Sequence, residues 1–355
     1  MVGEPDILFE RHGPLAAVIL NRPKSLNSLT LEMIRDLMPI LEAWEADESV
    51  EVVVIRGAGE RAFCAGGDVR AVWEAGKAGD RLTQDFFREE YILNREIHRY
   101  PKPFLALIDG ICMGGGVGLS VHGSHRIVGD RTLVAMPETA IGLFPDVGGS
   151  WFLPRLPGDT GRYLALTGAR VKAADACYLG IATHYIPGDH DAAVIEALAE
   201  ADYGDGDAYQ VVDKILASLA QDPDGAPLSR HRVAIDKIFS ADSIELILGG
   251  LELEGGDWAE EQLKILQSRS PTSMKISLEQ LKRGAALDFD GCMTMEYRMS
   301  QACMAGHDFY EGIRAVLVDK DHNPRWKPDS LDAVTPEMVQ TYFEPLGERD
   351  LIFTA

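Results

Sequence analysis

The first half of the chain alternates short apolar runs with amphipathic stretches. Apolar runs at residues 14–20, 51–56 and 104–108 predict buried strands, the second rich in β-branched residues, as in strands covered on both faces. Between the first two runs, apolar residues recur at the spacing of one helix face, starting at Leu31. Thr30 is a suitable N-cap, whereas Pro39 inside the pattern predicts a kink or break.

This order of strand, helix and strand predicts a βαβ unit with a right-handed crossover. A turn-rich loop at residues 57–69 and a polar helix at about 80–99 follow the second strand. The third strand leads into a glycine loop, and we expect a helix to start at Gly116. Further expected elements are strands at 126–128, 132–135 and 180–186, and helices at 160–167 and 172–179.

After about residue 190 the strand signal disappears and helical periodicity dominates. The expected helices cover residues 192–201, 209–219, 259–266, 273–283 and 336–342. Ser270 and Pro271 form a capping sequence before the fourth of these helices. The polar, proline-bearing segment 319–328 is expected to be a loop or surface strap. The pattern therefore predicts an α/β core over residues 1–190 and a helical region over 191–355 that packs on it.

Composition and charge exclude several classes of protein. The 355 residues are 46% hydrophobic and 25% charged, which is typical of a globular protein. The net charge of −22 argues against nucleic-acid binding, which depends on basic side chains. No run reaches the ~20 apolar residues that a membrane-spanning helix needs. The N-terminus lacks the pattern of a signal peptide, and the five cysteines are scattered, so we expect a reducing, cytoplasmic location.

The sequence gives little indication of a metal site or of a phosphate-binding site. No cysteine pair has C-x-x-C spacing and the nine histidines show no metal-binding spacing, so we expect no metal site. Arg22 with Lys24, and Arg99 with Lys102, are the basic pairs in the N-terminal half that could meet a phosphorylated ligand. Solvated surface charge explains each pair equally well.

Two loops rich in small residues carry the first sign of chemistry. Residues 62–68 (AFCAGGD) and 114–116 (GGG) each follow a strand, so their peptide N–H groups could point into a pocket. Two such loops could each direct one N–H group at a single oxygen, which is the design of an oxyanion hole. A plain surface turn and close packing of a helix on a strand are the alternatives.

Two carboxylates follow the glycine loop. Glu138 and Asp146 each stand next to a proline, with apolar neighbours at residues 141, 143, 144 and 147. A carboxyl group in apolar surroundings has a raised pKa, which suits proton transfer near neutral pH. A helix N-cap for Glu138 and an Asx-turn for Asp146 are the structural alternatives.

Two other motifs fail in context. Residues 57–62 match G-x-G-x-x-A, but the segment FCAGGD after them does not continue as a helix, so a dinucleotide site is disfavoured. Residues 118–122 resemble a nucleophile elbow, which would require glycine at His122.

These motifs together resemble the crotonase (enoyl-CoA hydratase/isomerase) superfamily. The resemblance rests on AFCAGGD at 62–68, G-x-x-M-G-G-G-V-G at 110–118 and AMPET at 135–139. Within it, the chain is similar to the 3-hydroxyisobutyryl-CoA hydrolase family. That similarity rests on FFREEY at 86–91, MPETAIGLFPDVGG at 136–149, SPTS at 270–273, MEYR at 295–298, SQACM at 300–304, GHDFYEGIRAVLVDKD at 306–321 and PRWKP at 324–328.

The resemblance implies a crotonase-like ββα spiral core with an α-helical C-terminal region. The thioester oxygen would accept hydrogen bonds from the peptide N–H groups of Cys64 and Gly115. Glu138 and Asp146 would be the catalytic residues, as these positions are in the family. The positions implied to bind the substrate are Leu26, Ser28, Ala65, Gly66 and Gly67 along the CoA moiety, and Glu90 at the acyl part.

One departure from the hydratase pattern indicates hydrolysis. Hydratases carry a second glutamate where this chain has Gly118, and a glycine where it has Asp146. We therefore expect hydrolysis of 3-hydroxyisobutyryl-CoA, and of 3-hydroxypropionyl-CoA, as in valine degradation. The expected partner is an acyl-CoA substrate, without a further cofactor, nucleic acid or membrane, in a chain that could form homo-oligomers. The alternatives are an enoyl-CoA hydratase or isomerase and a catalytically silent CoA-binding protein.

Overall fold

The chain folds into two compact units that each draw on separate stretches of the sequence. The computed structural model describes residues 4–204 and 206–353. The first unit contains the described residues up to Asp68, together with Ile92–Val134 and Val171–Ser229. The second contains Val69–Tyr91, Ala135–Arg170 and the described residues from Arg230 onward. The division near residue 190 that the sequence predicts stays a prediction.

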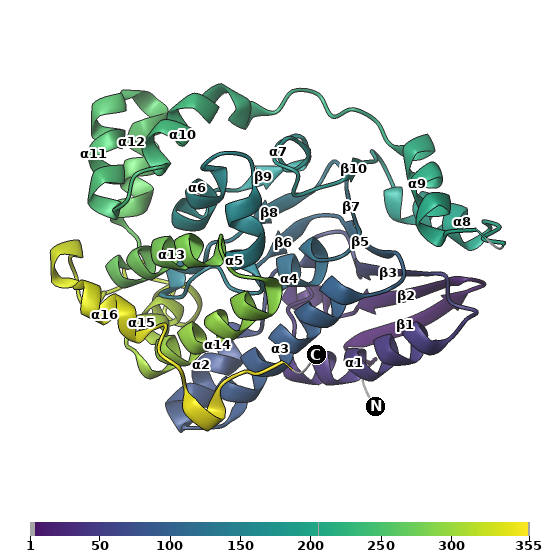
Figure 1. The fold of residues 1–355 in the computed structure, drawn as a ribbon, viewed down its shortest axis with the longest axis horizontal. Coiled ribbons are helices and arrows are strands. Elements are labelled where there is room, and N and C mark those ends of the chain that lie inside the picture. The colour runs from purple at the N-terminus through teal and green to yellow at the C-terminus, as the bar shows by residue number, and fades with distance from the viewer. Residues whose placement is uncertain (1–3, 205, 354–355) are drawn as a thin grey trace. The chain divides into compact units, whose positions relative to one another are not determined.

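A six-stranded sheet organises the first unit (Figure 1). Its strands, in spatial order, are β1 (Ile7–His12), β2 (Leu15–Leu20), β3 (Val52–Gly57), β5 (Phe104–Ile108), β7 (His125–Val128) and β10 (His184–Tyr185). Only the β1–β2 pair is antiparallel; the pairs that follow are parallel. The parallel pairing of β2 with β3 confirms the predicted βαβ unit.

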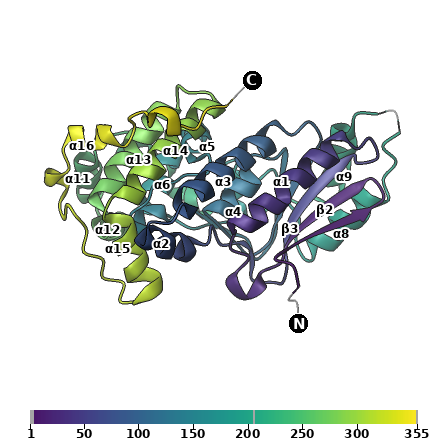
Figure 2. The ribbon, with the colours of Figure 1, turned by 90° about the horizontal axis from the view of Figure 1, so that it is seen from below.

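Helices cover both faces of this sheet. One face packs its apolar side chains, among them Ala17 and Val54, against α8 (His190–Ala199) and α9 (Ala208–Leu219). Side chains alternate along a strand, so Val18 and its partner Phe9 lie on the other face. There the Phe9 ring meets Trp44 of α1 (Leu31–Ala46), with ring centroids 5.9 Å apart. Figure 2 shows α1 and the α8–α9 pair on opposite sides of β2 and β3.

Helix α1 begins as predicted, but it does not break at its proline. The Thr30 hydroxyl accepts a hydrogen bond from the N–H of Met33 at 3.2 Å, as an N-cap does. The helix continues through Pro39 to Ala46, so it does not break there, and a kink stays a prediction. Five of its apolar side chains are buried, and this packing offsets the hydrogen bond that proline cannot make. Lys102 then donates to two carbonyls at its C-terminal end.

A second sheet of four short strands completes the first unit. Its strands, in spatial order, are β4 (Ala62–Cys64), β6 (Ile111–Met113), β8 (Leu133–Ala135) and β9 (Val171–Lys172). The sequence predicts loop at β4 and β6, because three-residue strands are too short to show an alternating pattern. Helix α4 (Gly115–Val121) starts one residue earlier than predicted, and α7 (Ala173–Tyr178) follows β9.

The second unit is helical. Its helices are α2 (Val69–Ala78), the first half of α3 (Leu82–Arg99), α5 (Gly149–Phe152), α6 (Thr160–Thr167), α10 (Arg232–Phe239), α11 (Ile244–Glu254), α12 (Gly256–Gln267), α13 (Pro271–Gly284), α14 (Phe289–Ala305), α15 (Asp308–Ile313) and α16 (Pro336–Thr341), with a 3-10 turn η2 (Glu138–Ile141). Ser270 caps α13 as predicted. The sequence pattern does not predict α2, α10, α11, α14 and α15. Among the residues that the structure describes, no helix is both long and apolar enough to cross a bilayer.

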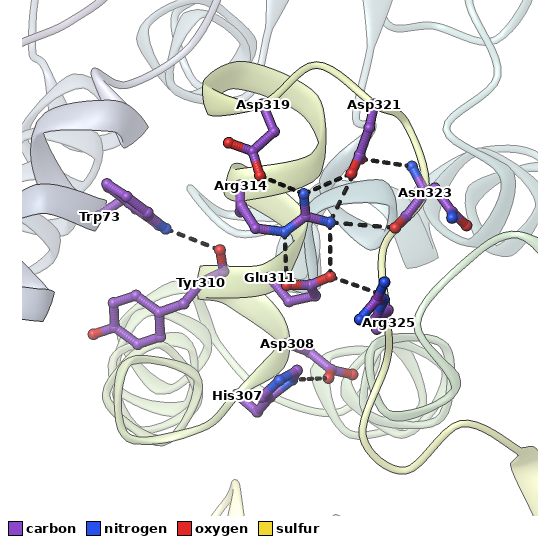
Figure 3. Close-up of polar contacts among 10 residues, drawn as sticks. All are labelled: Trp73, His307, Asp308, Tyr310, Glu311, Arg314, Asp319, Asp321, Asn323 and Arg325. Atoms are coloured by element: carbon purple, nitrogen blue, oxygen red, sulfur yellow. Dashed lines mark hydrogen bonds and ion pairs between the residues drawn. The ribbon is translucent and has the colours of Figure 1, made fainter.

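The predicted strap at residues 319–328 is irregular chain, and Arg314 makes several of the contacts that hold it (Figure 3). The Arg314 guanidinium donates hydrogen bonds to the carboxylates of Glu311, Asp319 and Asp321. Several charge-assisted bonds to one planar group fix its geometry more firmly than a single pair would. Carboxylates of α15 and of the strap therefore share in holding the strap against α15.

Candidate active site

The small-residue loop after β4 lies beside the segment that contains Leu26 and Ser28. The N–H of Ala65 donates to the carbonyl of Leu26 at 3.0 Å. The N–H of Leu29 donates to the carbonyl of Gly66 at 2.9 Å, and Leu29 forms a β-bridge with Gly67. The structure thus brings the predicted substrate-binding positions of the first unit into one place.

The two glycine-rich loops also meet within this unit. A side chain on Gly116 would place its Cβ atom 2.2 Å from the carbonyl oxygen of Cys64, so only glycine permits this approach. A Cβ atom on Gly66 would lie 3.9 Å from the nitrogen of Gly115. Gly115 is the first residue of α4, so its N–H has no carbonyl partner within the helix, and the helix dipole favours negative charge there.

Two of the basic residues considered for phosphate binding have structural partners. Arg22 donates to the Ser28 hydroxyl at 2.9 Å and forms an ion pair with Asp68 at 3.2 Å. Lys102 donates to the carbonyls at the end of α1. These bonds account for both side chains without a bound phosphate.

Glu138 stands at the start of the turn η2 in the second unit. Its side chain is 5% exposed, and its Oε2 atom is buried without a hydrogen-bond partner among the described residues. The Glu138 carbonyl accepts from the N–H of Leu143 at 3.1 Å, which closes the turn. Gly142 packs against the backbone of Asp308, where a Cβ atom would be 2.2 Å away. The turn is therefore in close contact with the start of α15.

Asp146 is held by a tyrosine from α3. The hydroxyl of Tyr91 donates to Oδ2 of Asp146 at 2.9 Å, and both side chains are buried. The carbonyl of Pro145 accepts from the amide of Gln280 at 2.6 Å. Burial raises the pKa of Asp146 to about 7, although the bond from Tyr91 opposes this shift. Near neutral pH this carboxyl can therefore both give and take a proton.

Glu90 and Glu138 share this environment. Burial raises the pKa of Glu90 well above its ordinary value, and the nearby charges of Asp146, Glu296 and Glu138 raise it further. Burial and the charge of Asp146 likewise raise the pKa of Glu138. Like charges in a dry site cannot all ionise together, so part of the cluster stays protonated. The second unit thus offers a carboxylate base next to a carboxylic acid.

Three supporting residues of this cluster are not predicted from the sequence: Tyr91, Gln280 and Glu296. Tyr91 and Gln280 look like ordinary core and helix residues. Glu296 does have a signal, since it falls on the buried face of α14 among cysteines and methionines. A charged residue on an apolar helix face needs a hydrogen-bond donor or an opposite charge nearby, but the sequence does not show which residue supplies it.

No metal site is found in the part of the chain that the structure describes. It contains no group of three or more histidine, cysteine, aspartate or glutamate side chains that could hold a metal ion.

Comparisons with known proteins cover almost the whole chain. A sequence profile described as enoyl-CoA hydratase/isomerase matches residues 15–343. The Xenopus tropicalis protein named 3-hydroxyisobutyryl-CoA hydrolase, mitochondrial, is 51% identical over 99% of this chain and 91% of its own length. The Homo sapiens protein of the same name is 48% identical over 98% and 91%. A solved structure described as a carnitinyl-CoA dehydratase from Mycobacterium thermoresistibile is 41% identical, covers 99% of both chains and has a TM-score of 0.92.

These relatives confirm the expected fold class, an α/β crotonase-like core with a helical C-terminal region. They contradict the expected location. The cytoplasmic location predicted from the sequence is wrong, because the curated relatives are named as mitochondrial. Scattered cysteines argue against an oxidising compartment, but they do not distinguish one reducing compartment from another.

Proposed function

Since this chain belongs to the enoyl-CoA hydratase/isomerase family, we propose that it hydrolyses 3-hydroxyisobutyryl-CoA to the free 3-hydroxy acid and CoA. The observation that carries this proposal is the buried Asp146, whose pKa is raised to about 7, in one cluster with Glu138. The near-full-length identity of 51% to a protein named for this hydrolysis supports it.

The peptide N–H groups of Cys64 and Gly115 would stabilise the oxygen of the thioester carbonyl as it becomes negative. This role follows from the family pattern, and the close approach of Gly116 to Cys64 supports it. Loss of one such donor typically slows catalysis ~10²–10³-fold. The CoA moiety would lie along Leu26, Ser28 and the small residues at 65–67.

Glu138 would promote hydrolysis of the thioester in one of two ways. As a general base it removes a proton from a water molecule that attacks the carbonyl carbon, and CoA leaves as the thiol. As a nucleophile it attacks the carbon itself and releases CoA, and water then opens the mixed anhydride. Single-turnover hydrolysis in heavy-oxygen water tests for the anhydride route. The label appears in the Glu138 carboxyl group only if the anhydride forms and water attacks it at the enzyme's carbon.

Asp146 and Glu90 would hold the 3-hydroxyl group of the substrate and assist proton transfer. Glu90 supports this role with a buried Oε1 atom that lacks a partner among the described residues. A site built to bond a hydroxyl rejects an analogue without one, because its buried polar groups are then left unpaired. Isobutyryl-CoA is the matched poor substrate.

A double-bond reaction is the second candidate, because a solved relative 41% identical is described as a carnitinyl-CoA dehydratase. Gly118 in place of the second glutamate of hydratases opposes it. Release of free thiol from 3-hydroxyisobutyryl-CoA, against loss of the enoyl absorbance of crotonyl-CoA, decides between the two. A silent CoA-binding protein would do neither.

The pH profile of kcat/KM is expected to fall on the acid side, with a limb well above the ordinary pKa of a glutamate. The base must be ionised to act, and burial raises the pKa of Asp146 to about 7 and that of Glu138 above its ordinary value. The rate would therefore drop about tenfold for each pH unit below the limb. Rates from pH 5 to 9, with circular dichroism at each pH to confirm folding, test this. A limb at pH 4 to 5 would contradict it.

Finer parts of the function are also proposed. Valine degradation would supply the substrate, and 3-hydroxypropionyl-CoA would be a second substrate. The two thioesters differ by one methyl group, which allows ~1–3 kcal/mol of discrimination. No cofactor beyond the CoA of the substrate is needed for a hydrolysis of this kind, and dialysis against chelator should leave the rate unchanged. Light scattering would show whether the chain forms homo-oligomers.

A further inference from the structure

A fourth buried carboxylate, Glu296, lies in the second unit and has no part in the chemistry proposed above. It stands in the middle of α14 with 0% exposure. It accepts hydrogen bonds from the N–H of Gly148 and the N–H of Ser150, each at 2.8 Å, and from the Ser150 hydroxyl. All three bonds come from the segment that directly follows Asp146, namely the turn at Gly148 and the first turn of α5.

This loop adopts a backbone that needs support. Val147 has a φ of +50°, which is rare for a β-branched residue, and Gly148 has a φ of +88°. A residue in such a conformation persists only where its surroundings over-determine it. Together these two residues turn the chain sharply between Asp146 and α5.

The loop is also clamped from α13. Gln280 donates to the carbonyl of Pro145, directly before Asp146. A Cβ atom on Gly284 would lie 2.1 Å from the carbonyl oxygen of Ser150, so the loop and the helix are in close contact. Glu296 therefore completes a set of contacts from two helices that fixes the loop on both sides of Asp146.

The bonds to Glu296 occupy both of its oxygens as acceptors. Each partner donates, and each oxygen of Glu296 accepts at least once. Burial raises the pKa of Glu296 to about 8, while the three hydrogen bonds from Gly148 and Ser150 oppose the shift. A buried carboxylate is costly unless donors surround it, and this one has three.

We propose that Glu296 is a positioning residue, which holds the left-handed turn at Val147 and Gly148 together with the start of α5 and thereby orients Asp146 for the reaction. This inference rests on the proposed hydrolysis only where the test measures kcat. An alternative is that Glu296 merely joins α14 to α5, with no bearing on Asp146.

Glu296→Gln tests the proposal with little change in shape. The amide group presents N–H donors to the donors of the loop, so at least one bond is lost and a repulsive contact replaces it. We expect kcat to fall ~10–100-fold, the range for one lost hydrogen bond to a charged group, with KM changed less than threefold. Ser150→Ala removes only the hydroxyl donor and should give a smaller loss of kcat in a protein that folds normally.

Arg298→Gln is the matched control on the same helix. Arg298 pairs with Asp350, which is 7% exposed, at 2.6 Å, so its loss disturbs α14 without touching the loop. An equal loss of kcat in Arg298→Gln and Glu296→Gln would overturn the positioning role.

Coupling to Asp146 gives the sharper criterion. In single-turnover hydrolysis, adding Glu296→Gln to Asp146→Asn should slow the reaction less than threefold further, because a residue that acts through Asp146 loses its effect without it. Losses that multiply in the double variant would refute the inference.

Amide hydrogen exchange is a readout that does not depend on activity. The N–H groups of Gly148 and Ser150 should exchange at least ~10-fold faster in Glu296→Gln, and at the same rate as wild type in Arg298→Gln. Unchanged exchange would overturn the inference even if the enzyme hydrolyses 3-hydroxyisobutyryl-CoA. Faster exchange in a chain that lacks this activity would sink the proposed hydrolysis and leave the role of Glu296 in the loop standing.

Discussion

Glu138→Gln is expected to lower kcat for thioester hydrolysis by ~10²–10⁴-fold, the typical contribution of a catalytic base. Glutamine keeps the size and shape of the side chain, but it can neither take a proton from water nor attack the thioester. The substrate contacts through CoA do not involve this residue, so KM should change little. Thiol release with a colorimetric reagent measures both constants.

Glu138→Gln should not lower the stability of the fold. A loss of activity in this variant would then come from the missing carboxylate and not from unfolding. Burial raises the pKa of Glu138 in the folded state above its unfolded value. Stability from this group is then fully present below the unfolded pKa and is lost as the pH rises through the folded pKa. Glutamine removes this loss, so the thermal midpoint at pH 8 should equal or exceed that of the wild type.

Glu254→Gln provides the matched control for this substitution. Glu254 is an acidic side chain at the end of α11 that pairs with Lys237 at 3.4 Å. We expect wild-type kcat for it. Activity of Glu138→Gln within tenfold of wild type would contradict the assignment of the base.

Gly116→Ala is expected to lower kcat/KM by ~10²–10³-fold, the cost of losing an oxyanion donor. The new Cβ atom would lie 2.2 Å from the carbonyl oxygen of Cys64 and 2.9 Å from the Cys64 Cβ atom. Because the nearest contact is backbone, the clash cannot be relieved by a side-chain rotation. The two loops must move apart, and the peptide groups of Cys64 and Gly115 lose their relative placement.

A matched glycine variant checks that the effect is local. Gly249 lies in α11, and among the described residues no neighbouring atom comes within 4 Å of the place that a Cβ atom would take. Gly249→Ala should therefore stabilise the helix by ~1 kcal/mol and leave kcat/KM unchanged. If Gly116→Ala is folded by circular dichroism and keeps full activity, the role of these loops is refuted.

The sequence by itself predicts those parts of the protein whose signal is local. The strands at 104–108 and 14–20 are found because burial on both faces demands an unbroken apolar run. The N-caps at Thr30 and Ser270 are found because one hydroxyl satisfies nearby N–H groups. The glycine loops and the carboxylates Glu138 and Asp146 are visible because small residues, prolines and charges stand out in an apolar segment, and the motif resemblance then names the family.

The tertiary structure decides what local signals cannot. Pro39 stays inside a helix because the buried face of α1 outweighs one missing hydrogen bond. The strands at 62–64 and 111–113 form only by pairing within the second sheet, and so few residues leave no pattern in the sequence.

The candidate site shows the same division. Glu138 and Asp146 can be picked out in the sequence, but the residues that hold Asp146 and the segment after it are far away along the chain. Tyr91 lies 55 positions before Asp146, and Glu296 lies 148 and 146 positions after its partners Gly148 and Ser150. Tyr91 and Glu296 acquire their roles only when folding buries them beside that loop. A pKa shift is a property of burial and neighbouring charge, so it belongs to the folded chain, whereas the identity of the carboxylates belongs to the sequence.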